Sequence, residues 1–262
     1  MIDYVVNGAV GVSMRNLRNG QNYFPYIAEL KDRVIKYIDI FCSMDSTAYD
    51  VDGESMDANP YSSALSLCKK DTVNLVVDNV SCVEYCPMLQ NGKRKFVGYK
   101  IDLEKSYIST ASDDAGANMF VVFYYEDEKP NAVTNPKNFK ISTSGVKFGV
   151  GTTNFFEDNR TLADKRFTQI YPSFSAFTQK GEQAILSPDA WGSMFVNLVK
   201  DNNVFVKNVP LSLLMTGSSF WYGHIVFDGV QIDFTRSYLQ TCASQQSIFN
   251  GYPVVLGFKY VD

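Results

Sequence analysis

A seven-residue string recurs in this chain almost unchanged. VNLVVDN occupies residues 73–79, and VNLVKDN occupies residues 196–202. When the match is extended at the same offset of 123, eight of sixteen positions are identical between residues 73–88 and 196–211. A string that returns at a fixed distance indicates an internal repeat, which restricts the fold to two copies of one architecture.

Two further blocks repeat in the same order. IDLEKSYIST at residues 101–110 matches IDFTRSYLQT at 232–241 with five identities. VVFYYED at 121–127 matches LGFKYVD at 256–262, so the second copy stops where the first copy meets the sequence between them. Three blocks in one order favour duplication over the chance similarity of β-rich segments.

A fainter match places the start of each copy. NYFPYIAELKDRVIKYI at 22–38 and NFFEDNRTLADKRFTQI at 154–170 share Asn, Phe, Leu, Asp and Ile. The stretch EDEKPNAVTNPKNFK at 126–140 has the Pro, Asn and charged residues of a linker. We therefore predict a first domain over residues 1–135, including an N-terminal arm, and a second over 136–262.

The local patterns within each copy are those of strands joined by turns. Apolar and polar side chains alternate through residues 32–41, and the 14% aromatic content, mostly Phe and Tyr, favours strands. Asp78-Asn79 and Asp201-Asn202 each predict the turn of a hairpin, because these residues tolerate positive φ. Further strands are expected over 95–103, 119–125, 146–150, 167–174, 220–234 and 252–261, and an arm or edge strand over 7–20.

Two segments have helical features. Ser187 and Pro188 predict the start of one or two helical turns over 187–198, and residues 60–70 are the candidate counterpart in the first copy.

About 125 residues per copy suit roughly eight strands, the size of one jelly-roll sandwich. The predicted fold class is all-β, with two tandem jelly-roll β-sandwiches and one or two short helices.

Charge and cysteine content limit the classes of partner. A net charge of −4 and a pI near 5.1 have the wrong sign for a protein whose main partner is nucleic acid. The first residues lack a secretory signal pattern, and no run of about 18 apolar residues occurs. Five cysteines, an odd number, predict reduced thiols, and Cys82 and Cys86 lack the second ligand pair of a zinc site.

Few residues suit acid-base, nucleophilic or metal chemistry. The single histidine, His224, lies in aromatic strand sequence and is expected to be a packed core residue. An acidic stretch over 44–57 offers oxygen ligands for calcium but lacks the flanking helices and final Glu of an EF-hand, so a solvated loop is the favoured interpretation. We predict no catalytic residues and no cofactor, and the candidate calcium ligands are Asp45, Asp50, Asp52, Glu54 and Asp57.

The repeat, the strand pattern and segments such as NYFPYIAELKDRVIKYIDI and IDFTRSYL resemble the double jelly-roll major capsid proteins of icosahedral viruses. The resemblance implies that three copies form a pseudo-hexameric tile and contact neighbouring capsid subunits and penton or minor capsid proteins. It also implies a virion location after synthesis in the host cytoplasm, an internal membrane beneath the shell, and no sequence-specific contact with nucleic acid. The Asn, Lys, Tyr and Phe bias is compatible with a bacteriophage source.

Two alternatives from other classes stay open. One is an auxiliary, ring or tail virion protein built from a duplicated β-domain. The other is a carbohydrate-binding or carbohydrate-acting double sandwich, for which Trp191 and Trp221 are the available tryptophans.

Overall fold

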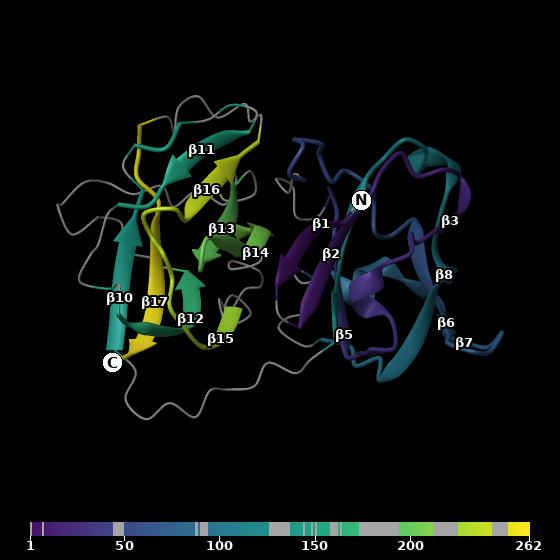
Figure 1. Cartoon of the computed structure of the whole chain (residues 1–262). Coiled ribbons are helices and arrows are strands. Elements are labelled where there is room, and N and C mark those ends of the chain that lie inside the picture. Colours follow the sequence, from purple (N-terminus) through teal and green to yellow (C-terminus); the bar gives the residue numbers. More distant parts are fainter. Residues whose placement is uncertain are drawn as a thin grey trace. The chain divides into compact units, whose positions relative to one another are not determined.

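The prediction of an all-β chain built from antiparallel sheets is confirmed by the computed structural model of the chain (Figure 1). The helical elements among the described residues are short 3-10 turns: η1 (Ala28–Leu30), η3 (Cys82–Tyr85) and η4 (Ser112–Asp114). None of them has the length and hydropathy of a membrane span. The structure describes residues 2–6, 8–43, 50–86, 89, 94–125, 137–143, 145–147, 149, 151–157, 162, 164–172, 194–211, 225–242 and 251–262.

The helix predicted over residues 60–70 is wrong, because Ser63–Lys69 forms strand β6. Leu65 and Leu67 alternate onto the core and are fully buried, so tertiary packing prevails over the local helical signal. In the second copy, residues 187–193 lie outside the described residues, and the rest of the predicted helix begins strand β13 (Met194–Lys200).

The chain divides into two compact units. Unit 1 is built from residues 1–50 and 54–127, and unit 2 from residues 51–53, 128–216 and 220–262. The predicted boundary at residue 135 falls within 126–136, which lies outside the described residues, and it stays a prediction.

Unit 1 contains two antiparallel sheets (Figure 1). One has the strand order β1-β2-β9-β5 and the other the order β3-β8-β6-β7. Their neighbours pair antiparallel throughout. The bounds are β1 Ile2–Val6, β2 Ala9–Met14, β3 Gly20–Tyr23, β5 Tyr37–Phe41, β6 Ser63–Lys69, β7 Leu75–Ser81, β8 Tyr99–Thr110 and β9 Met119–Tyr124, with a short β4 (Val34–Ile35) paired to β8.

Unit 2 has two sheets of the same kind. Their strand orders are β10-β17-β12-β15 and β11-β16-β13-β14. The strand predicted over 146–150 is wrong, because the residues described in that range lie in the turn between β10 and β11. The bounds are β10 Lys137–Ser142, β11 Thr152–Phe155, β12 Arg166–Pro172, β13 Met194–Lys200, β14 Asn203–Pro210, β15 Ile225–Val230, β16 Tyr238–Thr241 and β17 Val255–Val261.

The two units connect equivalent strands in the same order. In unit 2 the first strand, β10, pairs with the last, β17, and β12 and β15 continue that sheet. In unit 1, β2 pairs with β9 in the same way, and β5 follows. The second sheets correspond strand for strand, β3-β8-β6-β7 with β11-β16-β13-β14.

The place of β15 is taken in unit 1 by the residues just before β8. Val97 N–H donates to Lys36 O and Gly98 N–H donates to Ile35 O, both at 2.8 Å, which sets this segment beside the strand that leads into β5. Gly98 and Gly229 match in the repeat, and both have positive φ (79° and 61°), a conformation that favours glycine.

The hairpins β6-β7 and β13-β14 share one register. The pairs Leu65–Val80 and Leu67–Val77 in unit 1 correspond to Val196–Val209 and Leu198–Val206 in unit 2, with an irregularity after each first pair. The repeat therefore includes the local departures from regular pairing as well as the order of strands.

A side-chain bond closes each of these irregularities. Asn79 has φ 48° and its N–H donates to Ser66 Oγ at 3.0 Å. Asn208 has φ 50° and its N–H donates to Asn197 Oδ1 at 3.0 Å. Asn is suited to this place because it tolerates the left-handed region better than most residues.

The string match that first revealed the repeat aligns two strands that are not structurally equivalent. VNLVVDN ends within β7, with Asp78 and Asn79 inside the strand, whereas VNLVKDN covers β13 and its turn. The hairpin turn predicted at Asp201-Asn202 is confirmed, and the one predicted at Asp78-Asn79 is wrong. The structural match of β7 with β14 has an offset of 129 rather than 123.

The segment 7–20, predicted as a mobile arm or edge strand, is largely neither. Every residue of β2 is buried, and β2 lies between β1 and β9. Val10 and Val12 contribute to the core of unit 1 and are fully buried. The alternating Val residues of this segment were the signal for a core strand, and its glycines obscured it.

Each unit has its own apolar core. In unit 1 one cluster includes Val121 and Phe123 of β9 together with Leu65 and Ile108 of the other sheet, so the two sheets share one interior. In unit 2 the ring of Phe234 lies 5.0 Å from those of Phe167 and Phe258, in edge-to-face contact.

The end of β17 is fixed by a carboxylate between two lysines. Asp262 accepts from Lys137, at the start of β10, and from Lys165 at 2.5 Å. These two hydrogen bonds lower the pKa of Asp262 to about 2. Because the folded state favours the charged form, this stabilisation is present above pH 3.8 and is lost as the pH falls toward 2.

An NMR titration tests this arrangement. We expect the Asp262 carboxyl to titrate with a pKa near 2, and Lys137→Ala to raise that pKa. An Asp262 pKa near 3.8 in the wild type would contradict the contact.

Candidate functional site

The acidic stretch predicted as a calcium loop is used partly for internal contacts. Asp50 is fully buried, its Oδ2 forms an ion pair with Arg15, and its Oδ1 accepts from Glu54 N–H at 2.9 Å. Asp57 Oδ1 accepts from Asn118 N–H at 2.9 Å. These contacts connect the stretch to the residue that follows β2 and to the residue that precedes β9.

The candidate ligands are not brought together among the described residues, where no group of three or more His, Cys, Asp or Glu side chains could hold a metal ion. Asp45 lies outside the described residues. Asp52 and Glu54 are exposed. The calcium loop stays a prediction, and the buried Asp50 has a structural contact that the sequence did not reveal.

Two measurements distinguish a structural role of Asp50 from calcium binding by the acidic stretch. We expect Asp50→Ala to lower the free energy of unfolding by about 3 kcal/mol, because it removes the partner of Arg15 and a buried acceptor. Glu54→Ala is the matched control, with an effect within about 0.5 kcal/mol. A rise of the melting temperature with added calcium chloride would instead support an ion at this loop.

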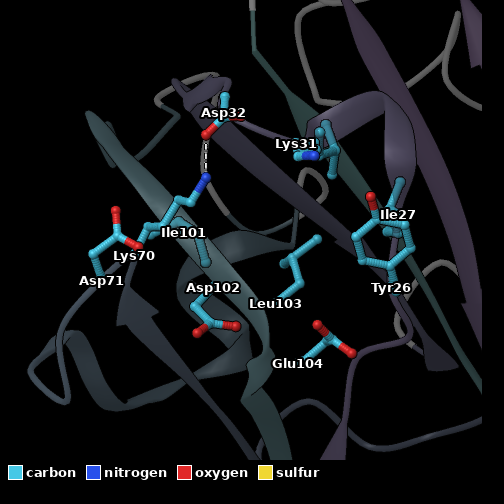
Figure 2. Close-up of a pocket in the computed structure, with 11 residues that line it drawn as sticks. Tyr26, Ile27, Lys31, Asp32, Lys70, Asp71, Ile101, Asp102, Leu103 and Glu104 are labelled. Carbon is cyan, nitrogen blue, oxygen red and sulfur yellow. Dashed lines mark hydrogen bonds and ion pairs between the residues drawn. The ribbon is translucent and has the colours of Figure 1, made fainter.

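Unit 1 contains a pocket of about 250 Å³ beside η1 (Figure 2). Its apolar wall comes from Ile27, Leu30 and Leu103, and its polar wall from charged side chains just after η1, in the β6-β7 turn and on β8. Figure 2 shows Lys70 pointing across one side toward Asp32. The other lining residues are Tyr26, Lys31, Asp71, Ile101, Asp102 and Glu104.

The charges of this pocket largely pair with one another. Hydrogen bonding to Lys70 lowers the pKa of Asp32, and hydrogen bonding to Asp32 raises the pKa of Lys70. Both groups lie at the surface, where such a pair contributes little to stability. The lining supplies amines, carboxylates and apolar groups, but no thiol, hydroxyl or imidazole nucleophile beyond the phenol of Tyr26.

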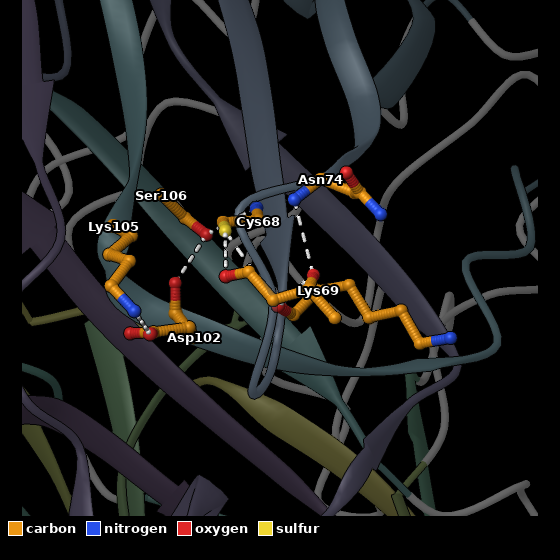
Figure 3. A network of polar contacts seen from close by, with 7 residues as sticks. Cys68, Lys69, Asn74, Asp102, Lys105 and Ser106 are labelled. Carbon is orange, nitrogen blue, oxygen red and sulfur yellow. Dashed lines mark hydrogen bonds and ion pairs between the residues drawn. The ribbon is translucent and has the colours of Figure 1, made fainter.

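The repeated block around Asp102 forms a polar network in unit 1 (Figure 3). Ser106 Oγ donates to Asp102 O at 2.6 Å and accepts from Cys68 N–H at 2.9 Å. Lys105 pairs with the Asp102 carboxylate at 2.8 Å. The serine satisfies backbone groups where the pairing of β6 with β8 is interrupted, so its role is to hold a bend in the strand.

The same network is present in unit 2. Ser237 Oγ donates to Asp233 O at 2.7 Å and accepts from Val199 N–H at 2.9 Å. Arg236 lies 3.6 Å from the Asp233 carboxylate. The repeat of Asp, a basic residue and Ser therefore has a structural explanation and is not evidence of a reaction.

An asparagine closes the turn before β3 and before β11. Asn22 Oδ1 accepts from Arg18 N–H at 2.7 Å, and Asn22 Nδ2 donates to Arg18 O at 2.9 Å. Asn154 makes the same two bonds with Lys147, at 2.8 and 3.1 Å. The faint match of residues 22–38 with 154–170 thus joins equivalent positions.

Each unit exposes an aromatic ring at the end of this strand. Tyr23 is 53% exposed and its ring lies 5.4 Å from that of Tyr107, its cross-strand neighbour on β8. Phe155 is 55% exposed and its ring lies 5.9 Å from that of Tyr238 on β16. Tyr23 matches Phe155 and Tyr107 matches Tyr238, so the exposed pair is part of the repeat.

The remaining residues singled out in the sequence are either buried cysteines or lie outside the described residues. None of the five cysteines forms a disulfide; Cys86 Sγ donates to Cys82 O at 3.3 Å and lies 3.4 Å from Cys42 Sγ. Burial raises the pKa of Cys82, which keeps this thiol protonated. His224, Trp191 and Trp221 lie outside the described residues.

No family model and no curated protein matches the chain. Among solved structures, the chain is similar to the crystal structure of the major capsid protein P2 from Bacteriophage PM2, with 9% sequence identity and a TM-score of 0.24. The alignment covers 98% of this chain and 92% of that protein. A TM-score this low supports no assignment, so a functional proposal has to rest on the strand order and the repeat.

Proposed function

We propose that the chain is a viral structural protein, a major capsid subunit in which two jelly-roll sandwiches stand in tandem and three chains form a pseudo-hexameric tile. The observation that carries the proposal is the equivalence of the two units. In both units the equivalent strands have the same connection order: β2 lies beside the last strand β9 in unit 1 as β10 lies beside β17 in unit 2, and β3-β8-β6-β7 corresponds to β11-β16-β13-β14.

This connection order supports the jelly-roll assignment. A jelly roll has eight strands in two sheets formed by Greek-key connections, and it is common in viral capsid and lectin domains. Unit 2 supplies all eight strands. Unit 1 supplies seven of them, β2, β3 and β5 to β9, plus the segment that contains Val97 and Gly98, and its strand β1 lies outside this set. The jelly-roll fold alone does not distinguish a capsid protein from a lectin. The argument for a capsid role therefore comes from the duplication.

Duplication favours a tiling role on geometric grounds. Three chains with two equivalent units each present six similar edges, which fit a six-fold position of a closed shell. A lectin or binding module can work with one unit, so its function does not require a second unit whose hairpin keeps the same register and irregularity. In this proposal the chain is structural rather than catalytic.

The proposed partners follow from a place in the shell. They are two further copies within the tile, neighbouring tiles, and penton or minor capsid proteins at the vertices. The acidic chain, with a net charge of −4, suits a layer that does not bind the genome directly, and an internal membrane would lie beneath it. The virion of a bacteriophage is the proposed location, after synthesis in the host cytoplasm.

Native mass spectrometry of the purified full-length chain tests the proposal. We expect a stable trimer, and electron microscopy of that species to show a tile with six similar lobes. A persistent monomer would contradict the tile. Six-fold or twelve-fold rings would favour an auxiliary, ring or tail protein, and specific binding on a glycan array by a monomer would favour the carbohydrate-binding alternative.

A further inference from the structure

The matching aromatic pairs, Tyr23 with Tyr107 and Phe155 with Tyr238, each join the outermost strand of the second sheet to its neighbour. We define the aromatic edge of unit 1 as β3 with Tyr23 and Tyr107, and the aromatic edge of unit 2 as β11 with Phe155 and Tyr238. In the described part of the chain, β3 and β11 pair with a neighbour on one side only.

The property shared by the two edges is an apolar ring. Tyr23 Oη donates to Gln21 Oε1 at 2.7 Å, a bond that Phe155 cannot make. The ring contact is retained in both units at similar tilt, 61° and 64°. What the repeat preserves is therefore a surface suited to packing rather than a hydrogen bond within the unit.

The two edges have the same backbone pairing with their inner neighbours but differ on their outer sides. Phe24 N–H donates to Ser106 O at 3.0 Å, and Phe156 N–H donates to Ser237 O at 3.2 Å. Because bonded residues alternate in an antiparallel pair, the backbone groups of Tyr23 and Phe155 point away from the neighbouring strand. Beside Phe155, Phe156 forms a bridge with Thr143, and Glu157 N–H donates to Ser142 O at 2.9 Å, so this side of the unit 2 edge is partly paired within its own unit. The feature that both edges share is therefore the exposed ring, which at Tyr23 is accompanied by outward backbone groups.

Neither edge has the charges or prolines that commonly protect an outer strand. The strand sequences are Gly-Gln-Asn-Tyr for β3 and Thr-Thr-Asn-Phe for β11. Edge strands of monomeric proteins are usually blocked by Lys, Pro or bulges, since an open edge pairs with other chains. Aromatic residues in such a place are typical of interfaces.

We propose that the two aromatic edges are equivalent contact surfaces through which copies of this chain associate, with Tyr23 and Phe155 at their centres. The partner is a second copy of the chain. An unrelated partner would need only one such surface, whereas assembly from repeated units uses the same surface at every contact. This inference rests on the proposed assembly and names its contact.

The alternative explanation is that each ring pair only stabilises its own sheet. A cross-strand aromatic pair contributes a few tenths of a kcal/mol to about 1 kcal/mol, which gives no dependence on protein concentration. The two explanations therefore differ in what a substitution changes, association in one case and the melting temperature of the unit in the other.

The test introduces lysine at each edge of the full-length chain. Tyr23→Lys and Phe155→Lys are made singly and together and are examined by light scattering, native mass spectrometry and thermal melting. We expect each single variant to weaken self-association by about 10- to 100-fold and the double variant to be a monomer with unchanged far-UV circular dichroism.

Two matched controls accompany these variants. Val73→Lys places the same charge at an 87% exposed position in the β6-β7 turn and leaves association unchanged. Tyr23→Phe retains the ring and leaves association unchanged, which separates ring packing from the loss of the phenol. If a lysine variant misfolds, Tyr23→Ser with Phe155→Ser supplies the measurement.

The outcomes separate this inference from the proposed function. If the wild type and the double variant both form a trimer, the aromatic edges are not the contact, but the proposed tile still stands. Rings with another symmetry that the double variant abolishes support the contact and overturn the tile. A wild type that stays monomeric at high concentration overturns both.

Discussion

Phe123→Ala is expected to lower the free energy of unfolding by about 4 kcal/mol, the cost of removing a large side chain from a closed core. Phe123 is fully buried on β9, which lies between β2 and β5. Its ring lies 5.2 Å from that of Phe24 at 81°, so the substitution also removes an edge-to-face contact. Chemical denaturation measures the loss.

The repeat provides a matched substitution. Phe258 matches Phe123, is fully buried, and contacts Phe167 and Phe234 with centroids 5.8 and 5.0 Å apart. Hydrogen exchange followed by mass spectrometry is expected to show faster exchange mainly in unit 1 for Phe123→Ala and mainly in unit 2 for Phe258→Ala. Val73→Ala, at the surface, changes neither, and a loss below about 1 kcal/mol for Phe123→Ala would contradict the packing.

Arg94→Met is expected to lower the free energy of unfolding by about 3–5 kcal/mol, because it leaves a buried carboxylate without its guanidinium partner. Asp39 is 1% exposed on β5, and its Oδ2 lies 3.2 Å from Arg94 Nη2. The guanidinium also lies 4.3 Å from the ring centroid of Tyr124. Calorimetric melting of the variant measures the loss.

A double substitution distinguishes an unpaired charge from lost packing. Asp39→Asn combined with Arg94→Met removes both charges, and we expect it to recover a large part of the stability lost in Arg94→Met alone. Lys95→Met is the control, because Lys95 pairs with the exposed Glu84 and contributes little. Equal losses for the single and double variants would show that the charge of Asp39 is not the cause.

The sequence predicted much of the fold because strand patterns and turn residues act locally. Alternating apolar residues indicated β5, β9, β12 and β17, each recovered within a few residues. The segment 60–70 misled because its short apolar run suits a helix or a strand equally, and only the shared core decides between them. β2 was expected only as part of an arm or edge strand, because the glycines of residues 7–20 weaken the pattern of a core strand.

The strongest string match was the least accurate guide to equivalence. VNLVVDN and VNLVKDN agree at six of seven positions but lie on different strands of their hairpins, β7 and β13. The faint match at residues 22 and 154 joins asparagines with the same two backbone bonds. Short Val- and Asn-rich strings recur readily in β proteins, whereas a shared bonding pattern requires the same surroundings.

The sequence by itself determined that the chain is built from strands, that it repeats, and that Asp-x-x-Lys-Ser and Asp-x-x-Arg-Ser occupy matching places, because these features depend on residues close together along the chain. The tertiary structure alone decided which strands are equivalent, that Asp50 and Asp39 are buried with arginine partners, and that Tyr23 and Phe155 remain at the surface. The reason is physical: pairing register and burial are set by contacts between residues distant in sequence, and the same apolar ring can complete a core or cover a contact with another chain.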